Sequence, residues 1–510
     1  MLLGDLIEHH LSRTADRPAI HFKDQVVTFG EIDERINRVA NTLLDAGVEK
    51  GDRVAVHIGN LPEFVYAYYG IMRAGGVMVS LNVMYKSGEV QYMANDSEIK
   101  AAIVHDSVYP VWEPVRDAMP TLRHLFVAGA TPPNARSFHQ VLAEGSTSRA
   151  RVECAEDDVA VICYTAGTTG KPKGAMLTHR NLISNAQAVI ELKRFPLSDQ
   201  DCSLLVLPIF HIYCLTVGLG SGMQLGYPMV LVERFDPLLV LELLERHRAT
   251  VFYGAPPMYV AMSAVQSDRR FDLGACRIMH SGAAALPVPV LERFQARHGI
   301  MITEGYGLTE CSPVVCSNGA APANRAGSIG YPIPGVLTKV FDDHNNEVAA
   351  GEVGELVVRG PNVFKGYLNW PDATREAFAG GWFHTGDMAR INPDGYHYIV
   401  DRKKEMVNMS GFNVYPREVE ELLYRHPNIA EAAVIGVPDE YSGEAVKAFI
   451  VTKPGETMTA EDVIQYCRAN LAVYKAPRHV EFREALPKLV GGVKIDKRML
   501  HAEEAEKPSA

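Results

Sequence analysis

The chain has 510 residues, of which 47% are hydrophobic and 22% are charged, a balance typical of globular proteins. Its length predicts about two to four domains with room for a sizeable core. It carries 50 Lys and Arg against 61 Asp and Glu, a formal net charge of −11. This balance argues against a nucleic-acid binder, which needs a basic surface to neutralise phosphates, but it allows local basic sites for anionic substrates.

The eight cysteines form no CxxC pair, and most stand among apolar residues, as in Val161-Ile162-Cys163. This pattern predicts buried, reduced thiols and a cytoplasmic protein. The residues from Met1 to Glu8 lack the basic and apolar segments of a signal peptide, so none is expected.

Helical and strand patterns alternate along the first hundred residues. Apolar residues at three-to-four spacing predict a helix that opens near Thr28 and closes at Gly47. A strand is expected over 53–58, a helix over 61–74 and another strand over 77–81. Such repetition predicts parallel sheets covered by helices.

A run without any Asp, Glu, Lys or Arg extends from Ser203 to Val232. It is long enough to cross a bilayer. Its density of Gly and Pro favours instead a buried strand, a turn and a small-residue helix beside a cavity. We therefore expect no transmembrane segment.

The pattern changes between Ser328 and Arg359, where short strands and dense turns predict a small antiparallel or barrel-like unit. A charged run, Asp401-Arg402-Lys403-Lys404-Glu405, then marks a domain boundary at Lys404. Beyond it, helices are expected over 416–424 and 460–471, and strands over 432–437 and 445–451.

The predicted fold class is therefore α/β. A large N-terminal domain, residues 1–403, is expected to contain stacked α/β sheets and the small β-barrel-like unit. A small mobile α+β domain, residues 404–510, would follow it, with a frayed tail from Glu503.

The most informative segment follows a buried strand over 159–163. It reads Tyr164-Thr165-Ala166-Gly167-Thr168-Thr169-Gly170-Lys171-Pro172-Lys173-Gly174. Glycines and hydroxyl residues in a turn bring N–H and O–H donors close to an anion, and two lysines add charge. A Walker A loop does not fit, because Lys171 is followed by Pro172. The segment predicts a phosphate loop of another kind, with a flexible solvated loop as the alternative.

This loop resembles the signature of the adenylate-forming superfamily, which includes acyl-CoA synthetases, firefly-type luciferases and peptide-synthetase adenylation domains. Three further stretches resemble the family's other motifs, in its order: Gly305-Tyr306-Gly307-Leu308-Thr309-Glu310, Gly381-Trp382-Phe383-His384-Thr385-Gly386-Asp387, and residues 401–405 with 410–416. The resemblance covers essentially the whole chain. Within the family, Thr178-His179-Arg180-Asn181-Leu182 and the segments 207–211 and 442–447 look most like bacterial long-chain fatty-acid–CoA ligases.

The resemblance implies an ATP-dependent, AMP-forming ligase with ATP, Mg²⁺ and CoA as cofactors. It would activate a medium- to long-chain fatty acid as acyl-AMP and transfer the acyl group to CoA. Both steps move negative charge, so fixed donors, magnesium and lysines would supply most of the acceleration.

The same resemblance assigns roles at the phosphate end of the nucleotide. Glu310 would bind Mg²⁺ with help from Thr165, although a carboxylate at this place can also cap a helix. The phosphates would be held by the loop residues Thr165, Thr168, Thr169, Gly170 and Lys173.

At the nucleoside end, Tyr306 would stack on adenine, and Asp387 would accept hydrogen bonds from two ribose hydroxyls. Arg402 would reach the ribose or the phosphates. A core tyrosine, a turn-capping aspartate and a surface charge are the ordinary alternatives. Small residues of the 305–310 motif and of the 281–284 segment would make further contacts to the nucleotide: Gly282, Gly307 and Thr309.

The catalytic assignments are His211 and Lys494, besides Glu310. By resemblance, His211 lies near the acyl carboxylate and the α-phosphate, although a histidine among apolar residues can be a satisfied core residue. The family places a lysine in a Pro-Lys-x3-Gly-Lys pattern, and here Val493 falls on that lysine unless one residue is inserted. An insertion absorbed by two glycines makes Lys494 the functional lysine. Lys497, or a protein that binds acyl-AMP without forming it, is the alternative.

Use of one site for two steps implies that the small domain changes orientation, with Lys404 as the hinge residue and Asp401 as second choice. Gly411 would let the CoA pantetheine pass close to the backbone, unless it is an ordinary turn glycine.

An aryl or other carboxylate–CoA ligase and a non-catalytic acyl-nucleotide or CoA-binding protein are the competing functions. Pyrophosphate release separates a ligase from a binder, and the profile of accepted acids separates fatty from aryl ligases. Peptide-synthetase adenylation and luciferase-type oxygenation fit less well. The expected partners are small molecules, with no nucleic acid; transient membrane contact and a homodimer are compatible with this function.

Overall fold

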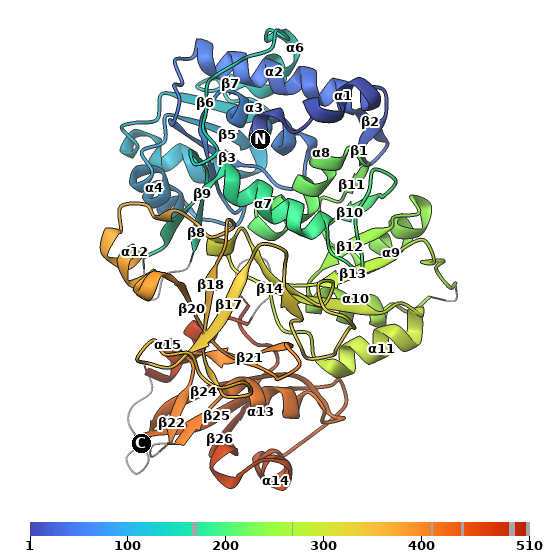
Figure 1. Ribbon diagram of the computed structural model, residues 1–510, viewed down its shortest axis with the longest axis vertical. Helices are drawn as coiled ribbons and strands as arrows, with labels where there is room; N and C mark the ends of the chain where they lie inside the picture. The colour runs from blue at the N-terminus through green and yellow to red at the C-terminus, as the bar shows by residue number, and fades with distance from the viewer. Residues whose placement is uncertain (166–170, 268, 410–411, 440–442, 489–494, 506–510) are drawn as a thin grey trace.

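The computed structural model describes residues 1–165, 171–267, 269–409, 412–439, 443–488 and 495–505 (Figure 1). It is a mixed α/β structure with two large sheets, a four-stranded antiparallel sheet and a C-terminal α+β unit. The predicted fold class is confirmed. The C-terminal unit, orange to red in Figure 1, lies at the opposite end of the molecule from the first helices.

The eight-stranded sheet carries the strands that flank the phosphate loop. It is parallel from β8 through β7, whereas β8, β9 and β19 pair antiparallel at one end. Its strand order is β19 (Gly366–Tyr367), β9 (Lys173–Thr178), β8 (Val159–Thr165), β4 (Val77–Ser80), β3 (Arg53–His57), β5 (Ala101–His105), β6 (His124–Ala128) and β7 (Arg136–Ser137).

The nine-stranded sheet is parallel in its centre and antiparallel at both ends. Its order is β16 (Tyr331–Pro332), β15 (Val314–Ser317), β14 (Ile302–Gly307), β13 (Ile278–Ser281), β12 (Val251–Gly254), β10 (Ser203–Leu205), β11 (Met229–Leu231), β1 (Pro18–Phe22) and β2 (Gln25–Thr28). One hydrophobic core joins residues of both large sheets with the helices that cover them.

The two helices predicted in the first hundred residues are confirmed. The helix expected from Thr28 is α2 (Phe29–Asp45), which Thr28 and Glu31 begin with a reciprocal capping box. The other helices of the N-terminal part are α1 (Glu8–Thr14), α3 (Pro62–Arg73), α4 (Ser87–Asp96), α5 (Tyr109–Trp112), α6 (Phe138–Glu144), α7 (His179–Ile190), α8 (Ser221–Leu225), α9 (Pro237–Arg246), α10 (Pro256–Ala264), α11 (Val288–His298) and α12 (Pro371–Ala377). Short helical turns are η1 (Leu3–Asp5), η2 (Asp106–Val108), η3 (Glu113–Ala118), η5 (Thr309–Cys311) and η6 (Ala379–Gly381).

The uncharged run forms strand β10, a turn, the π-helix η4 (Cys214–Gly220), α8 and strand β11, as its Gly and Pro content predicts. Val217 of η4 lines a cavity. Among the residues that the structure describes, no helix has both the length and the apolar character needed to cross a membrane.

The small antiparallel unit is the sheet β17 (Leu337–Phe341), β18 (Gly354–Arg359), β20 (Phe383–Ile391) and β21 (His397–Arg402). The C-terminal sheet has the order β23 (Phe412–Val414), β22 (Val407–Met409), β25 (Gly443–Thr452) and β24 (Ile429–Asp439), and β26 (His479–Phe482) pairs with β25. Its helices are α13 (Pro416–Leu423), α14 (Ala460–Asn470), η7 (Val473–Lys475) and α15 (Lys497–Ala505).

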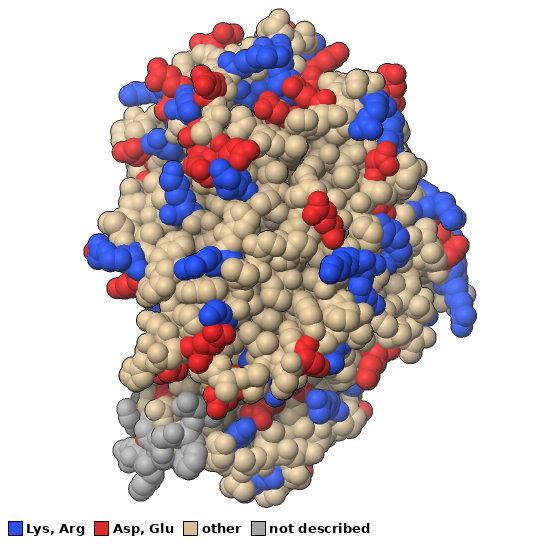
Figure 2. All heavy atoms as spheres, viewed as in Figure 1, with Lys and Arg blue, Asp and Glu red and all other residues tan. Residues whose placement is uncertain are grey.

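The prediction of a frayed tail from Glu503 was wrong for its first residues. Residues 503–505 belong to α15, where Glu503 pairs with Arg483 and Glu504 with Lys447. These ion pairs to β25 and to the end of β26 supply the anchorage that the local sequence does not reveal. Over the face shown in Figure 2, acidic and basic side chains are interspersed around broad uncharged areas.

Candidate functional site

The two strands that flank the phosphate loop are paired where the loop begins and ends. Thr165 at the end of β8 stands opposite Lys173 at the start of β9, and the Thr165 hydroxyl donates to the Lys173 carbonyl oxygen at 3.4 Å. Both predicted phosphate ligands therefore lie side by side. Thr168, Thr169 and Gly170 lie outside the described residues.

An aromatic side chain links Lys173 to Glu310. The Lys173 ammonium lies 5.4 Å from the ring centroid of Tyr367 and 5.2 Å from that of Trp370. The Tyr367 hydroxyl donates to Oε1 of Glu310 at 2.9 Å. Sequence reasoning missed Tyr367, because nothing in its local sequence marks it and only the pairing of β19 with β9 brings it here.

Glu310 is a buried carboxylate, and burial raises its pKa. Among the described residues, no group of three His, Cys, Asp or Glu side chains is placed to hold a metal. Magnesium usually takes one or two protein carboxylates, with substrate phosphates and waters as its other ligands. A single buried carboxylate beside a phosphate loop fits that requirement, and a cation would offset the cost of burying its charge.

Three predicted nucleoside ligands meet where the paired strands β20 and β21 contact β14 of the nine-stranded sheet. Arg402 of β21 donates from Nε to Oδ1 of Asp387 in β20 at 2.7 Å, and the hydroxyl of Tyr306 in β14 donates to Oδ2. Asp387 is only 4% exposed at its side chain, whereas Arg402 is 50% exposed. The Asp387 carboxylate raises the pKa of Arg402, and burial raises that of Tyr306. The Asp387 carboxylate therefore lies between two donors, the Arg402 guanidinium and the Tyr306 hydroxyl.

The structure gives a packing reason for two predicted glycines. A Cβ on Gly307 would lie 2.2 Å from the Pro313 carbonyl oxygen, and one on Gly282 would lie 2.9 Å from the Tyr213 ring. Both positions therefore exclude larger residues whether or not a ligand is bound. Thr309 begins the short helix η5 that carries Glu310.

His211 follows β10 in a turn that leads into η4. The backbone N–H of Tyr213 donates to His211 Nδ1 at 3.3 Å, so in the neutral ring Nε2 carries the proton. His211 is exposed, and desolvation by the protein around the ring lowers its pKa. Asn60, which sequence reasoning also missed, holds the turn by donating to the carbonyl oxygen of Leu207 at 3.0 Å.

An apolar cavity lies behind this turn. The Tyr213 hydroxyl contacts Nδ1 of His280 at 2.8 Å, and His280 forms part of the cavity wall. Burial lowers the pKa of His280 to about 4, so this ring is neutral. The cavity is partly open to solvent and has a volume of about 20 Å³. Its lining is Val189, Leu192, Phe195, Leu197, Val217, Tyr253, Ile278, His280, Thr303, Val314, Ser317 and Gly319.

In the C-terminal unit, two ion pairs hold the candidate lysine Lys497. Lys497 Nζ lies 2.9 Å from Glu420 and 3.1 Å from Glu405, and although burial alone would lower its pKa, these carboxylates raise it. Lys494 and Gly411 lie outside the described residues.

The two hinge candidates differ in their surroundings. Lys404 is exposed in the turn after β21. Asp401 is buried, accepts a hydrogen bond from the backbone N–H of Arg417 at 2.8 Å, and burial raises its pKa to about 6.

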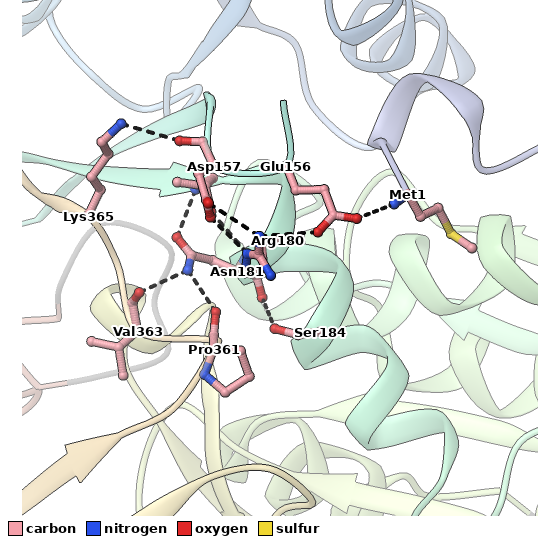
Figure 3. Close-up of polar contacts among 10 residues, drawn as sticks. Met1, Glu156, Asp157, Arg180, Asn181, Ser184, Pro361, Val363 and Lys365 are labelled. Carbon is pink, nitrogen blue, oxygen red and sulfur yellow. Dashed lines mark hydrogen bonds and ion pairs between the residues drawn. The ribbon is translucent and has the colours of Figure 1, made fainter. Parts of the chain in front are cut away.

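Figure 3 shows a polar cluster at the start of α7. The Arg180 guanidinium pairs with Asp157 at 2.8 Å and with Glu156 at 3.4 Å, and the Lys365 ammonium donates to the Asp157 carbonyl oxygen at 3.2 Å. The neighbouring Asn181 points to the chain segment at Val363. The sequence showed these α7 residues only as a resemblance and assigned them no role.

The structure thus groups the candidate site residues into the Thr165–Lys173 strand pair, the buried Glu310 and the Tyr306–Asp387–Arg402 cluster. The chain belongs to the AMP-binding enzyme family, whose model matches residues 7–368, while that of the AMP-binding enzyme C-terminal domain matches residues 418–492. It is an adenylate-forming acid–CoA ligase of the acyl or aryl type.

Relatives align with nearly the full length of the chain. A long-chain-fatty-acid–CoA ligase of Bacillus subtilis (strain 168) is 36% identical over 99% of this chain and 95% of its own. The structure of anthranilate CoA ligase AuaEII with anthranoyl-AMP is 29% identical, with a TM-score of 0.92 over 99% of this chain and 97% of its own. ATP-bound MatB from Rhodopseudomonas palustris is 32% identical, with a TM-score of 0.91 over 99% of both chains.

Proposed function

We propose that this ligase activates a medium- to long-chain fatty acid with ATP and transfers the acyl group to CoA. The observation that carries the proposal is the cavity behind His211, whose described lining contains no Asp, Glu, Lys or Arg side chain. Burying an alkyl chain against such a surface is favourable, whereas a second carboxylate would lack a partner there. The long-chain ligase from Bacillus subtilis, aligned end to end, supports the same substrate class.

The path from His211 to the cavity orients the acid. His211 Nε2–H would donate to the carboxylate, and the alkyl chain would pass Gly282 and Tyr213 into the cavity. Space beside Gly282 is tight, since a Cβ there would lie 2.9 Å from the Tyr213 ring. The carboxylate would thereby be held at the α-phosphate as the nucleophile, which supplies the proximity that a weak nucleophile needs.

The nucleotide would lie across the two clusters described above. Lys173, Thr165 and the loop residues Thr168, Thr169 and Gly170 are proposed for the phosphates. Magnesium, held by Glu310 with help from Thr165, would neutralise charge that develops on the phosphates. Asp387 and Arg402 are proposed for the ribose and Tyr306 for the adenine, with Gly282, Gly307 and Thr309 beside them.

For the lysine of the first half-reaction we propose Lys494. Its rival Lys497 already has two carboxylate partners, Glu405 and Glu420, and could reach a ligand only by leaving both. We further propose a boundary between residues 403 and 404, with the exposed Lys404 as the hinge and Gly411 beside the incoming CoA. Cytoplasmic location, a homodimer and transient membrane contact stay predictions.

An aryl acid is the second candidate, because three rings stand together at the cavity. Tyr213, Tyr253 and His280 have centroids 6.1–6.2 Å apart in edge-to-face arrangements. Such a group can also receive an aromatic acid edge to face. The anthranilate ligase structure supports this alternative.

One experiment tests these assignments. The protein is incubated with Mg²⁺, ATP, CoA and a mixture of acetic to stearic and aromatic acids, and the CoA esters are identified by mass spectrometry. Long-chain acyl-CoA as the main product is expected. Aryl-CoA as the main product would favour the second candidate, and no CoA ester or acyl-AMP from any acid would contradict ligase function.

A further inference from the structure

A short segment, residues 361–365, lies between the start of α7 and the loop that carries Glu310. On the α7 side, Asn181 Nδ2 donates to the carbonyl oxygens of Pro361 at 2.8 Å and Val363 at 2.9 Å (Figure 3). On the other side, the Phe364 N–H donates to the backbone carbonyl of Glu310 at 2.8 Å. The Asn181 amide therefore joins α7 to a segment that also contacts Glu310.

The chain just beyond this segment reaches the Glu310 carboxylate. Three residues after Phe364, the Tyr367 hydroxyl donates to Glu310 Oε1 at 2.9 Å. Glu310 is thus contacted at its backbone by Phe364 and at its side chain by Tyr367. Displacement of the segment from α7 would act directly on the Phe364 contact, whereas Tyr367 is also held by the pairing of β19 with β9.

The Asn181 amide is fully used in this arrangement. Both of its N–H groups are donated to the segment, and its Oδ1 accepts from the Thr178 N–H at 2.8 Å. An aspartate could make only the last of these bonds, since it has no donors when ionised. The side chain is buried, so each lost bond would leave an unpaired polar group.

One helical turn later, Asn185 holds the other end of the Glu310 loop. Its Nδ2 donates to the carbonyl oxygen of Val314 at 2.8 Å, and its Oδ1 accepts from the Val314 N–H at 3.1 Å. Residues four apart on a helix share one face, so Asn181 and Asn185 present two amides to the same loop system. Two amides of α7 therefore hold chain segments on both sides of Glu310.

We propose that Asn181 is a positioning residue for the magnesium–ATP complex, acting through residues 361–367 on Glu310. This inference rests on the proposed function, which assigns the cation to Glu310. Groups that orient a metal ligand typically change metal affinity or activity by about 10–100-fold when removed.

The test measures ATP binding by calorimetry in Mg²⁺ and in EDTA, with no acid or CoA present. The tightening of ATP binding by Mg²⁺ is the readout. Asn181→Asp keeps an oxygen for Thr178 but removes both donors. We expect it to reduce the gain in ATP affinity caused by Mg²⁺ by about 10–100-fold, while the ATP affinity in EDTA changes little. If the aspartate variant does not fold, Asn181→Ala provides the comparison without a charge against two carbonyl oxygens.

Two variants separate positioning from general damage to α7. Thr178→Ala removes the cap of the helix but leaves the Asn181 donors in place, so it is expected to lower the unfolding temperature and keep the Mg²⁺ effect. Arg180→Ala, the exposed neighbour, is also expected to keep it. An equal loss in Asn181→Asp and Thr178→Ala would overturn the inference.

Glu310→Gln distinguishes this inference from the proposed function beneath it. If Glu310→Gln leaves the Mg²⁺ effect unchanged, the assignment of the cation to Glu310 fails. If it removes the effect while Asn181→Asp retains it, only the positioning role fails. If both act through one ligand, the double variant is expected to be no weaker in Mg²⁺-dependent binding than Glu310→Gln alone.

Discussion

Asp387→Asn tests the nucleoside end of the site with almost no change of shape. The wild-type carboxylate accepts from Arg402 Nε at 2.7 Å and from the Tyr306 hydroxyl. In the proposed complex it also accepts from two ribose hydroxyls. The amide keeps one acceptor oxygen but removes the charge, so the ribose contacts weaken and the protein is expected to stay folded.

The expected effect follows from the strength of these bonds. Hydrogen bonds to charged groups contribute about 1.5–3 kcal/mol and neutral ones about 0.5–1.5, so each ribose contact weakens by about 1–1.5 kcal/mol. Two contacts amount to about 2–3 kcal/mol, a ~30- to 150-fold rise in KM for ATP. Because Tyr306 and Arg402 already donate to the carboxylate, we expect the rise in KM to lie near the lower end of this range. Ribose contacts exist before and during reaction, so kcat is expected to fall less.

Pyrophosphate release at varied ATP measures both constants, and 2′,3′-dideoxy-ATP isolates the ribose contacts. Wild-type protein is expected to lose affinity for the dideoxy nucleotide, whereas Asp387→Asn is expected to discriminate much less. Asp394→Asn is the matched control, since this exposed carboxylate pairs with Arg325 just beyond the same strand. Equal discrimination by wild type and Asp387→Asn would refute the assignment.

Three further predictions concern stability, the acid and the lysine. Burial raises the pKa of Glu304 from 4.5 to about 7, so ionising it in the folded protein costs up to about 3 kcal/mol, a cost that grows as pH rises from 4.5 through 7. Glu304→Gln is therefore expected to raise the thermal unfolding midpoint several times more at pH 8 than at pH 5, and an equal shift at both would contradict this. Val217→Phe, which fills the cavity, is expected to lower kcat/KM for palmitate relative to octanoate by ~10-fold or more, the scale of one or two methylene contacts. An unchanged chain-length profile by mass spectrometry would argue against this cavity as the site of the alkyl chain. Lys494→Ala is expected to slow acyl-AMP formation by ~10²–10³-fold, whereas Lys497→Ala would mainly lower stability by unpairing Glu405 and Glu420; comparison of pyrophosphate release with unfolding midpoints decides between them.

The local sequence predicted most of the elements that position the site. The helix from Thr28, the strands over 53–58 and 77–81, and the helices over 416–424 and 460–471 are all confirmed, within a few residues at their ends. These patterns succeed because burial on one face imposes a period that is written in neighbouring residues. The absence of charge between Ser203 and Val232 was also interpreted correctly, since its Gly and Pro content opposes one long helix.

What neighbours in sequence could not reveal is which distant residues meet. Tyr306, Asp387 and Arg402 were grouped in advance only through a family resemblance, and their contacts depend on three strands from two different sheets. The contact of Tyr367 with Glu310 spans 57 residues, and that of Asn181 with Pro361 spans 180. Neither pair carries a local signal, because an amide or a hydroxyl is ordinary until folding gives it a partner.

Patterns among neighbouring residues were thus enough to predict the periodic elements, the order of the motifs and the family. Packing of the whole chain sets the π-helical form of η4, the anchoring of residues 503–505 in α15, the composition of the cavity and the contacts of α7 around Glu310. This difference comes from the range of the interactions. Periodicity and capping act over a few residues, whereas buried hydrogen bonds, ion pairs and cavity walls join groups that only the packed chain brings within reach.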